Sequence, residues 1–143
     1  YINFNNNKIK ILKSNCFYIH SNNIRRYYLC NNQISYIEPY AFYKLNNLVE
    51  LDLSINNLSF IDTIVFNDLK SLKYLNLSFN KIESIDKNMT LILTSLVIFD
   101  ISYNKIKLLE CESFANLKYV QLLYLNSNLF DKMNHFGFLE TNT

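Results

Sequence analysis

The sequence has almost no glycine or proline: Gly137 and Pro39 are the single copies among 143 residues. A glycine-rich loop that cradles phosphate is therefore excluded, because its backbone needs several closely spaced glycines. Turns in the chain must also depend on another residue type. The 23 asparagines can supply them, since Asn tolerates left-handed backbone conformations and bonds to its own main chain.

Charge of one sign and long apolar runs are lacking as well. The 14 basic and 12 acidic residues leave a net charge of +2, so no nucleic-acid partner is expected. No apolar run approaches the roughly 20 residues that cross a bilayer, so we expect no membrane insertion by this segment. Hydrophobic residues nonetheless make up 50% of the chain, which predicts one domain with a substantial core. Since the chain begins at Tyr1, we expect a piece of a longer protein.

What is present is a pattern that repeats with a period of 24 residues. LVELDLSINNL at 48–58 and LKYLNLSFNKI at 72–82 share the spacing L-x-x-L-x-L-S-x-N-x-(L/I). The same register continues in both directions, which predicts a partial repeat followed by five full ones. The predicted boundaries are 1–23 for the partial repeat, then 24–47, 48–71, 72–95, 96–119 and 120–143.

The repeat has a direct structural interpretation. Hydrophobic residues at its fourth and sixth positions alternate with polar neighbours, as in a short strand with one buried face. One unit cannot bury its own leucines, so the units stack, share a core and form a parallel sheet. The ninth position is always Asn, whose amide can bond backbone groups of its own and adjacent turns. These residues are Asn32, Asn56, Asn80, Asn104 and Asn128.

Two positions depart from the pattern. A Phe recurs near position nineteen, where it is expected to fill the convex side, but Thr90 occupies that slot in the third full repeat. We expect Met89, Leu91 or Leu93 to replace it in the core. Tyr27 stands in a Leu slot, which predicts locally looser packing. The Phe residues at the recurring slot are Phe42, Phe66, Phe114 and Phe138.

The segment NQISYIEPYAFYKLNNLVELDLSINNL, residues 32–58, resembles the 24-residue typical class of leucine-rich repeats, found mainly in extracellular proteins. The resemblance implies an α/β solenoid: an arc or horseshoe segment with a parallel concave sheet and an irregular or short-helical convex side. It implies a protein-recognition module of an extracellular or cell-surface receptor, adhesion or innate-immune protein, with Toll-like receptors as models. An intracellular or viral scaffold, or a non-binding spacer within a larger receptor, are the alternatives.

Cysteine and histidine predict no chemistry. The cysteines are odd in number and none forms a C-x-x-C pair; Cys30 falls on the strand face, and Cys16 and Cys111 fall on return segments. We expect unpaired thiols, although Cys16 could pair within a missing N-terminal part. His20 and His135 stand alone and are expected to be structural. With no nucleophile motif, phosphate loop or metal-ligand spacing, the sequence predicts neither an enzyme nor a cofactor.

The positions that the motif leaves variable point to a protein partner. On the strands they face the concave sheet, where solenoids commonly bind. Aromatic and aliphatic residues beside polar ones predict a partner-binding patch, since such clusters often mark interaction sites. Phe79 and Tyr103 have a second interpretation, in which they only cover the edge of the turn. The predicted patch is Tyr74, Asn76, Phe79, Ile98, Asp100, Tyr103 and Tyr124.

Two further features lie on these repeats. The pair Arg25 and Arg26 is expected to meet Glu50 and Asp52 one coil further on. Three N-x-S/T sequons are possible glycosylation sites: the convex Asn88 is the most accessible, and a glycan at Asn76 would lie on the binding face. The sequons begin at Asn57, Asn76 and Asn88.

Overall fold

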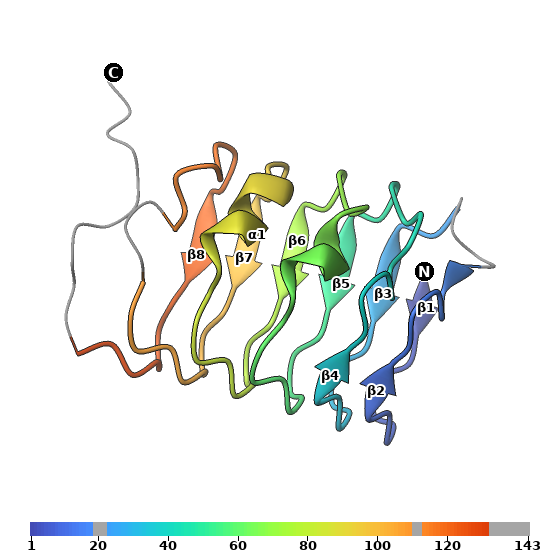
Figure 1. Ribbon diagram of the computed structural model, residues 1–143, viewed down its shortest axis with the longest axis horizontal. Helices are drawn as coiled ribbons and strands as arrows, with labels where there is room; N and C mark the ends of the chain where they lie inside the picture. The colour runs from blue at the N-terminus through green and yellow to red at the C-terminus, as the bar shows by residue number, and fades with distance from the viewer. Residues whose placement is uncertain (19–22, 110–112, 132–143) are drawn as a thin grey trace.

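The computed structural model describes residues 1–18, 23–109 and 113–131. Its main element is a parallel sheet of six short strands in the order β1-β3-β5-β6-β7-β8, which stand side by side along the long axis (Figure 1). A second parallel pair joins β2 to β4. The strands are β1 (Ile2–Asn3), β2 (Ile11–Leu12), β3 (Arg26–Tyr28), β4 (Tyr36–Ile37), β5 (Glu50–Asp52), β6 (Tyr74–Asn76), β7 (Ile98–Asp100) and β8 (Leu122–Tyr124).

The register of the sheet follows the period of the sequence. From β3 to β8 every residue pairs with the residue 24 positions further on, as Glu50 does with Tyr74. The first coil is offset by 25 instead, since Ile2 of β1 pairs with Tyr27 and Ile11 of β2 pairs with Tyr36. A constant offset stacks equivalent residues in columns, so each column of the repeat becomes a stripe across the sheet. The predicted parallel solenoid is confirmed.

Short helical turns lie in two of the return segments. The 3₁₀ turn η2 (Thr63–Phe66) and the helix α1 (Lys87–Ile92) lie next to each other. Each begins after an aspartate whose carboxylate accepts a hydrogen bond from a backbone N–H of the first turn: Asp62 at 3.0 Å and Asp86 at 2.8 Å. Such caps satisfy N–H groups that have no partner inside the helix. The convex side is therefore irregular with short helical turns, as predicted.

The convex core shows which side chains take the place of the missing Phe near Thr90. Met89 and Leu93 are buried, at 3% and 1% exposure, whereas Leu91 is 56% exposed. Thr90 itself is fully buried, and its hydroxyl donates to the Lys87 carbonyl at 2.8 Å. Thr90 therefore stays in the Phe slot, because the preceding helical turn satisfies its hydroxyl while Met89 and Leu93 supply the apolar volume. Leu91 points outward and does not replace the Phe.

The expected loose packing at Tyr27 was wrong. Tyr27 is fully buried, with its ring centroid 4.5 Å from that of Phe17, which in turn stacks on Phe42 at 5.6 Å. A series of aromatic rings thus fills the space where leucines pack elsewhere. The phenolic oxygen, however, is buried without a hydrogen-bond partner. Burial of the phenol, reinforced by neighbouring Cys16, raises the pKa of Tyr27 to about 12.

The asparagine column closes the turn in every full coil, as predicted. The Nδ2 of Asn56 donates to the carbonyls of Leu53 and Ser54 in its own coil and of Leu29 in the preceding one, each at 3.0 Å. Its Oδ1 accepts from the Ile34 N–H at 2.9 Å. One side chain therefore satisfies buried backbone groups in two coils. The other members of the column make the same bonds between coils: Asn32, Asn80, Asn104 and Asn128.

Turns without glycine depend only partly on asparagine. Nine described residues have positive φ, of which three are Asn. At position eight of the coils the left-handed residue is Asn at the N-terminal end, but Ile, Phe, Tyr or Ser further along. Hydrogen bonds between coils hold this conformation, for example from Phe79 N–H to the Ser102 carbonyl at 3.1 Å. The column is Asn6, Asn31, Ile55, Phe79, Tyr103 and Ser127.

Some predictions fall on residues that the structure does not describe. Those for the histidines, for one cysteine and for the last Phe of the series lie outside the described ranges. These residues are His20, His135, Cys111 and Phe138.

Candidate binding surface on the concave face

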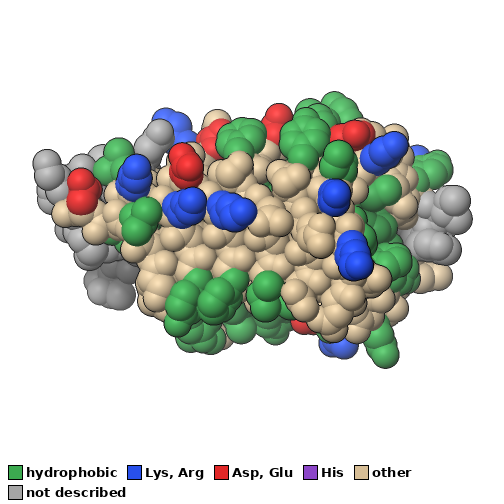
Figure 2. All heavy atoms as spheres, turned by 90° about the horizontal axis from the view of Figure 1, so that it is seen from below, with side chains coloured by type: hydrophobic (Ala, Val, Ile, Leu, Met, Phe, Trp, Pro, Cys, Tyr) green, Lys and Arg blue, Asp and Glu red, His purple; other side chains and the backbone are tan. Residues whose placement is uncertain are grey.

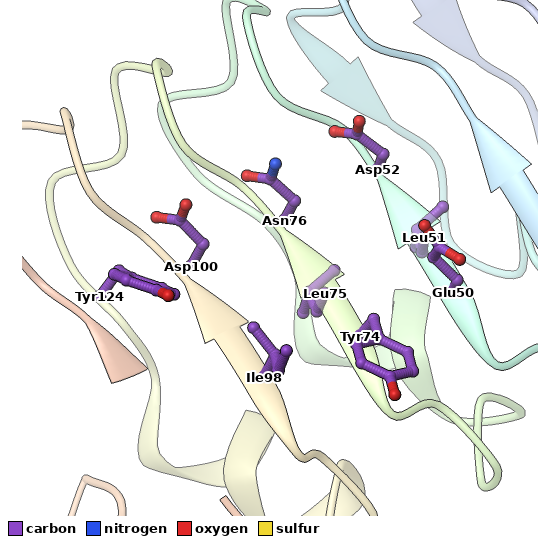
Figure 3. Close-up of a pocket in the computed structure, with 9 residues that line it drawn as sticks. All are labelled: Glu50, Leu51, Asp52, Tyr74, Leu75, Asn76, Ile98, Asp100 and Tyr124. Carbon is purple, nitrogen blue, oxygen red and sulfur yellow. The ribbon is translucent and has the colours of Figure 1, made fainter. Parts of the chain in front are cut away.

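A hollow of about 150 Å³ lies on the concave sheet across β5 to β8 (Figure 3). Most of its lining comes from the outward residues of these strands, because alternate side chains of a strand point to opposite faces, and the buried Leu51 and Leu75 also border it. It brings together five of the seven residues predicted for the patch, and Phe79 and Tyr103 are not among them. Its lining residues are Glu50, Leu51, Asp52, Tyr74, Leu75, Asn76, Ile98, Asp100 and Tyr124.

The polar side chains of the hollow are held in place within their own coils. The Oδ1 of Asn76 accepts from the Ser78 N–H at 3.0 Å and from its hydroxyl at 2.7 Å. Asp100 makes the same two bonds to Ser102, at 2.9 and 2.6 Å. Asp52 repeats the arrangement, and the three side chains stand in a row (Figure 3). Each side chain therefore lines the hollow while its Oδ1 is bonded to the turn that follows the strand.

The prediction of the patch did not anticipate this role of the serine. The signal is nevertheless in the sequence, as an Asp or Asn two residues before a Ser in three successive repeats. Side chains of this type commonly bond the backbone N–H two residues further on. The polar column is therefore part of the turn as well as of the surface.

Phe79 and Tyr103 form a separate patch beyond the ends of the strands. Their rings are stacked, with centroids 4.1 Å apart and an interplanar angle of 8°. They remain 50% and 45% exposed, and Ile55 in the preceding coil is 47% exposed. Viewed from below, groups of hydrophobic side chains lie along both the lower and the upper border of the view, and several Lys and Arg side chains lie between them (Figure 2). Exposure leaves the pair accessible to a partner, and both interpretations of it, a contact surface and a cover for the turn, stay predictions.

Charged groups at the N-terminal end of the face agree only partly with the prediction. Arg26 Nε lies 3.1 Å from a carboxylate oxygen of Glu50, which confirms one half of the expected contact. Asp52 instead bonds to Ser54. Burial, followed by the nearby Glu50 carboxylate, raises the pKa of Tyr28.

The sequons lie in three different environments. Asn88 is exposed in the first turn of α1 on the convex side. Asn57 is half-buried, and its N–H donates to the Ile34 carbonyl at 2.8 Å. Asn76 lines the concave hollow. Glycosylation of these residues stays a prediction, and Asn88 has the most open position.

No metal chemistry is evident in the described part of the chain, which contains no cluster of three or more His, Cys, Asp or Glu suited to a metal ion. Cys16 and Cys30 are free thiols. Cys30 lies two residues past the end of β3 rather than on the strand as predicted, because the strand ends at Tyr28. Desolvation of the thiolate raises the pKa of Cys16 to about 11, and its Sγ–H donates to the Ala41 carbonyl at 3.9 Å.

The repeat, the register and the asparagine column together define the family. The family profile described as leucine rich repeat matches residues 22–82 and 76–130. The chain belongs to the leucine-rich repeat family. A search of curated proteins found no match. Among the described residues of this leucine-rich repeat chain, no helix has the length and apolarity to span a membrane.

Solved structures share the fold. A chain of the Toll–Spatzle complex, from Drosophila, is 26% identical over 76% of this chain and 14% of that one, with a TM-score of 0.73. A chain of the TLR13–ssRNA13 complex is 22% identical over 91% of this chain and 22% of that one, with a TM-score of 0.67. An internalin (inlF) from Listeria monocytogenes is 25% identical over 76% of this chain and 30% of that one, with a TM-score of 0.62. This chain thus spans less than a third of each of these proteins.

These likenesses refine the expectations about partners. Leucine-rich repeat domains are protein-interaction modules, and the Toll structure was solved in complex with Spatzle. The exclusion of nucleic acid, which rested on net charge alone, has no support from them, since TLR13 was solved with single-stranded RNA.

Proposed function

We propose that this chain is a protein-recognition module of an extracellular or cell-surface receptor, with an innate-immune or adhesive role. It binds its partner through the concave face and performs no catalysis. The hollow across β5 to β8 carries the proposal. It places the exposed rings of Tyr74 and Tyr124 around the polar groups of Asn76 and Asp100. Tyrosines with one apolar face and one polar end are typical anchors of protein interfaces.

Pre-organisation supports this function. Asn76 and Asp100 are held by two hydrogen bonds each, and the strands beneath them are held by the ladder between coils. A surface that is ordered before it binds loses less conformational entropy in the complex. The stacked pair Phe79 and Tyr103 extends the contact surface toward the turn edge. A partner that spans both patches meets a rigid row of aromatic side chains beside carboxylates.

Photo-crosslinking tests the proposal and identifies the partner. A benzoylphenylalanine replaces Tyr74 on the concave face, and in a matched control it replaces Tyr119, which is 67% exposed outside the hollow. We expect the Tyr74 position, and not the Tyr119 position, to crosslink one extracellular protein reproducibly. That protein is then purified and its affinity is measured directly.

The affinity of the purified partner for variants provides the decisive measurement. Tyr74→Ala combined with Phe79→Ala should weaken binding roughly 30-fold or more, as expected for aromatic anchors. Tyr36→Ala combined with Tyr119→Ala removes two exposed tyrosines outside the hollow and should leave affinity unchanged. Unchanged affinity of the folded Tyr74 and Phe79 variant would show that the concave face is not the contact surface.

A further inference from the structure

A second hollow, of about 500 Å³, lies at the edge of the sheet where β3, β5 and β6 begin. Its charged lining is entirely cationic: Arg25 precedes β3, Arg26 begins it, and Lys73 precedes β6. Tyr1, Asn23 and Val49 complete the wall. No carboxylate lines this hollow, whereas Asp and Glu line the hollow described above.

The stacking of coils brings these cations together. Arg25 and Lys73 occupy the same position of the repeat two coils apart, with Val49 between them. Parallel strands are ~4.8 Å apart, so the two backbones are separated by roughly 10 Å. Long Arg and Lys side chains can converge over a short valine at that separation. An anionic group between them receives charge-assisted hydrogen bonds from both sides.

The charges of the hollow are only partly compensated. Glu50 pairs with Arg26, whose Nε lies 3.1 Å from a carboxylate oxygen, so the charge of Arg26 is shared with Glu50. Among the described residues, Arg25 and Lys73 have no ion-pair partner. Residues 19–22, which precede Asn23 in the sequence, contain no Asp or Glu. Two uncompensated cations and a third that is shared therefore face one cavity.

We propose that this hollow binds a phosphate monoester. Such a group carries a charge of about −1.5 to −2 at neutral pH, which matches the two free cations, and offers three acceptor oxygens. A sulfate ester, with a single negative charge, matches them less well. The cavity leaves space beside the cations for the group that carries the phosphate, with the Tyr1 side chain as part of its wall. This site is distinct from the concave hollow and does not depend on the proposed function.

Titration with phenyl phosphate and phenyl sulfate tests the proposal, because the two probes share a carrier and differ in charge. The wild-type chain should bind phenyl phosphate saturably and at least about tenfold more tightly than phenyl sulfate at neutral pH and constant ionic strength. Arg25→Gln combined with Lys73→Gln should weaken phenyl phosphate binding by about tenfold or more. All of these side chains are exposed, and circular dichroism establishes that the variants fold.

A charge-matched control separates a site from general attraction. Lys81→Gln combined with Lys105→Gln lowers the net charge equally, but both lysines follow the asparagine column past the other end of the strands. This control should bind phenyl phosphate as the wild type does. The proposal is wrong if the wild type shows no saturable binding, if both double variants lose affinity equally, or if the two esters bind equally.

Discussion

The buried phenol of Tyr27 leads to a prediction with an unusual sign: Tyr27→Phe should stabilise the protein. The side chain is fully buried, and its oxygen has no hydrogen-bond partner. An unsatisfied buried polar group costs about 1–3 kcal/mol. Phenylalanine removes that oxygen and keeps the ring that lies 4.5 Å from Phe17. We therefore expect the free energy of unfolding at neutral pH to rise by about 1–3 kcal/mol.

The same residue predicts a loss of stability in alkali. The pKa of Tyr27 is raised from 10.0 to about 12 in the folded chain. Between these values the unfolded chain releases the phenolic proton while the folded chain keeps it, so unfolding becomes easier as the pH rises. Each pH unit between the two pKa values lowers the free energy of unfolding by about 1.4 kcal/mol, and two units lower it by about 2.7 kcal/mol. The contribution of the raised Tyr27 pKa to the free energy of unfolding is fully present below pH 10 and is lost as the pH rises toward 12. The Tyr27→Phe variant has no phenol at this position and therefore lacks this alkaline loss.

Urea denaturation of wild type and Tyr27→Phe, followed by circular dichroism near pH 7 and near pH 11, measures both effects. Tyr74→Phe is the matched control, because Tyr74 is 39% exposed whereas Tyr27 is fully buried. The control should change the unfolding free energy by less than about 0.5 kcal/mol at either pH. A Tyr27→Phe variant less stable than wild type, or with the same alkaline loss, would refute the reasoning.

Three further predictions concern single residues. Asn80→Ala should lower the unfolding free energy by about 1–3 kcal/mol, because it leaves the buried Leu58 N–H unpaired and removes three further hydrogen bonds to carbonyls that each keep another donor. Urea melts of this variant and of exposed Asn67→Ala, which is expected to stay within about 0.5 kcal/mol of wild type, measure the difference. Ile55→Asn should stabilise by about 1 kcal/mol, since Ile55 has φ of 53° and left-handed backbone disfavours a β-branched side chain; a destabilised variant in the same assay contradicts this account. Cys16 should react with iodoacetamide near pH 8 on the order of 100-fold more slowly than a thiol with the ordinary pKa of 9.0, because its pKa of about 11 lowers the fraction of thiolate. Mass spectrometry of the labelled peptide measures the rate, and labelling as fast as that of free glutathione would contradict the prediction.

The strand columns could be predicted because the period of 24 is a property of the sequence. Once Glu50 pairs with Tyr74, the positions of all remaining outward residues in these two repeats are fixed. The grouping of Tyr74, Asn76, Ile98, Asp100 and Tyr124 around one hollow follows from that register alone. The asparagine bonds were predictable for the same reason, since a buried amide at a constant position must satisfy constant backbone groups.

Other features depend on how neighbouring coils pack, which the repeat pattern does not encode. Leu91 and Leu93 are equally hydrophobic, and only the direction of α1 exposes one and buries the other. Tyr27 is an outlier in the pattern, yet Phe17 closes the space around it. Phe79 adopts a left-handed conformation because the next coil accepts its N–H, which overrides its local preference.

The sequence by itself determined the repeat, the parallel stacking, the turn-closing asparagines and the list of outward positions, because each follows from one period and the chemistry of buried amides. The tertiary structure alone decided how the outward residues divide between separate surfaces. It separated the concave hollow from the stacked Phe79 and Tyr103, and it brought Arg25 and Lys73 to one cavity across an intervening coil. Cavities form between side chains of different coils, and their shape depends on rotamers and neighbours that a linear pattern does not contain.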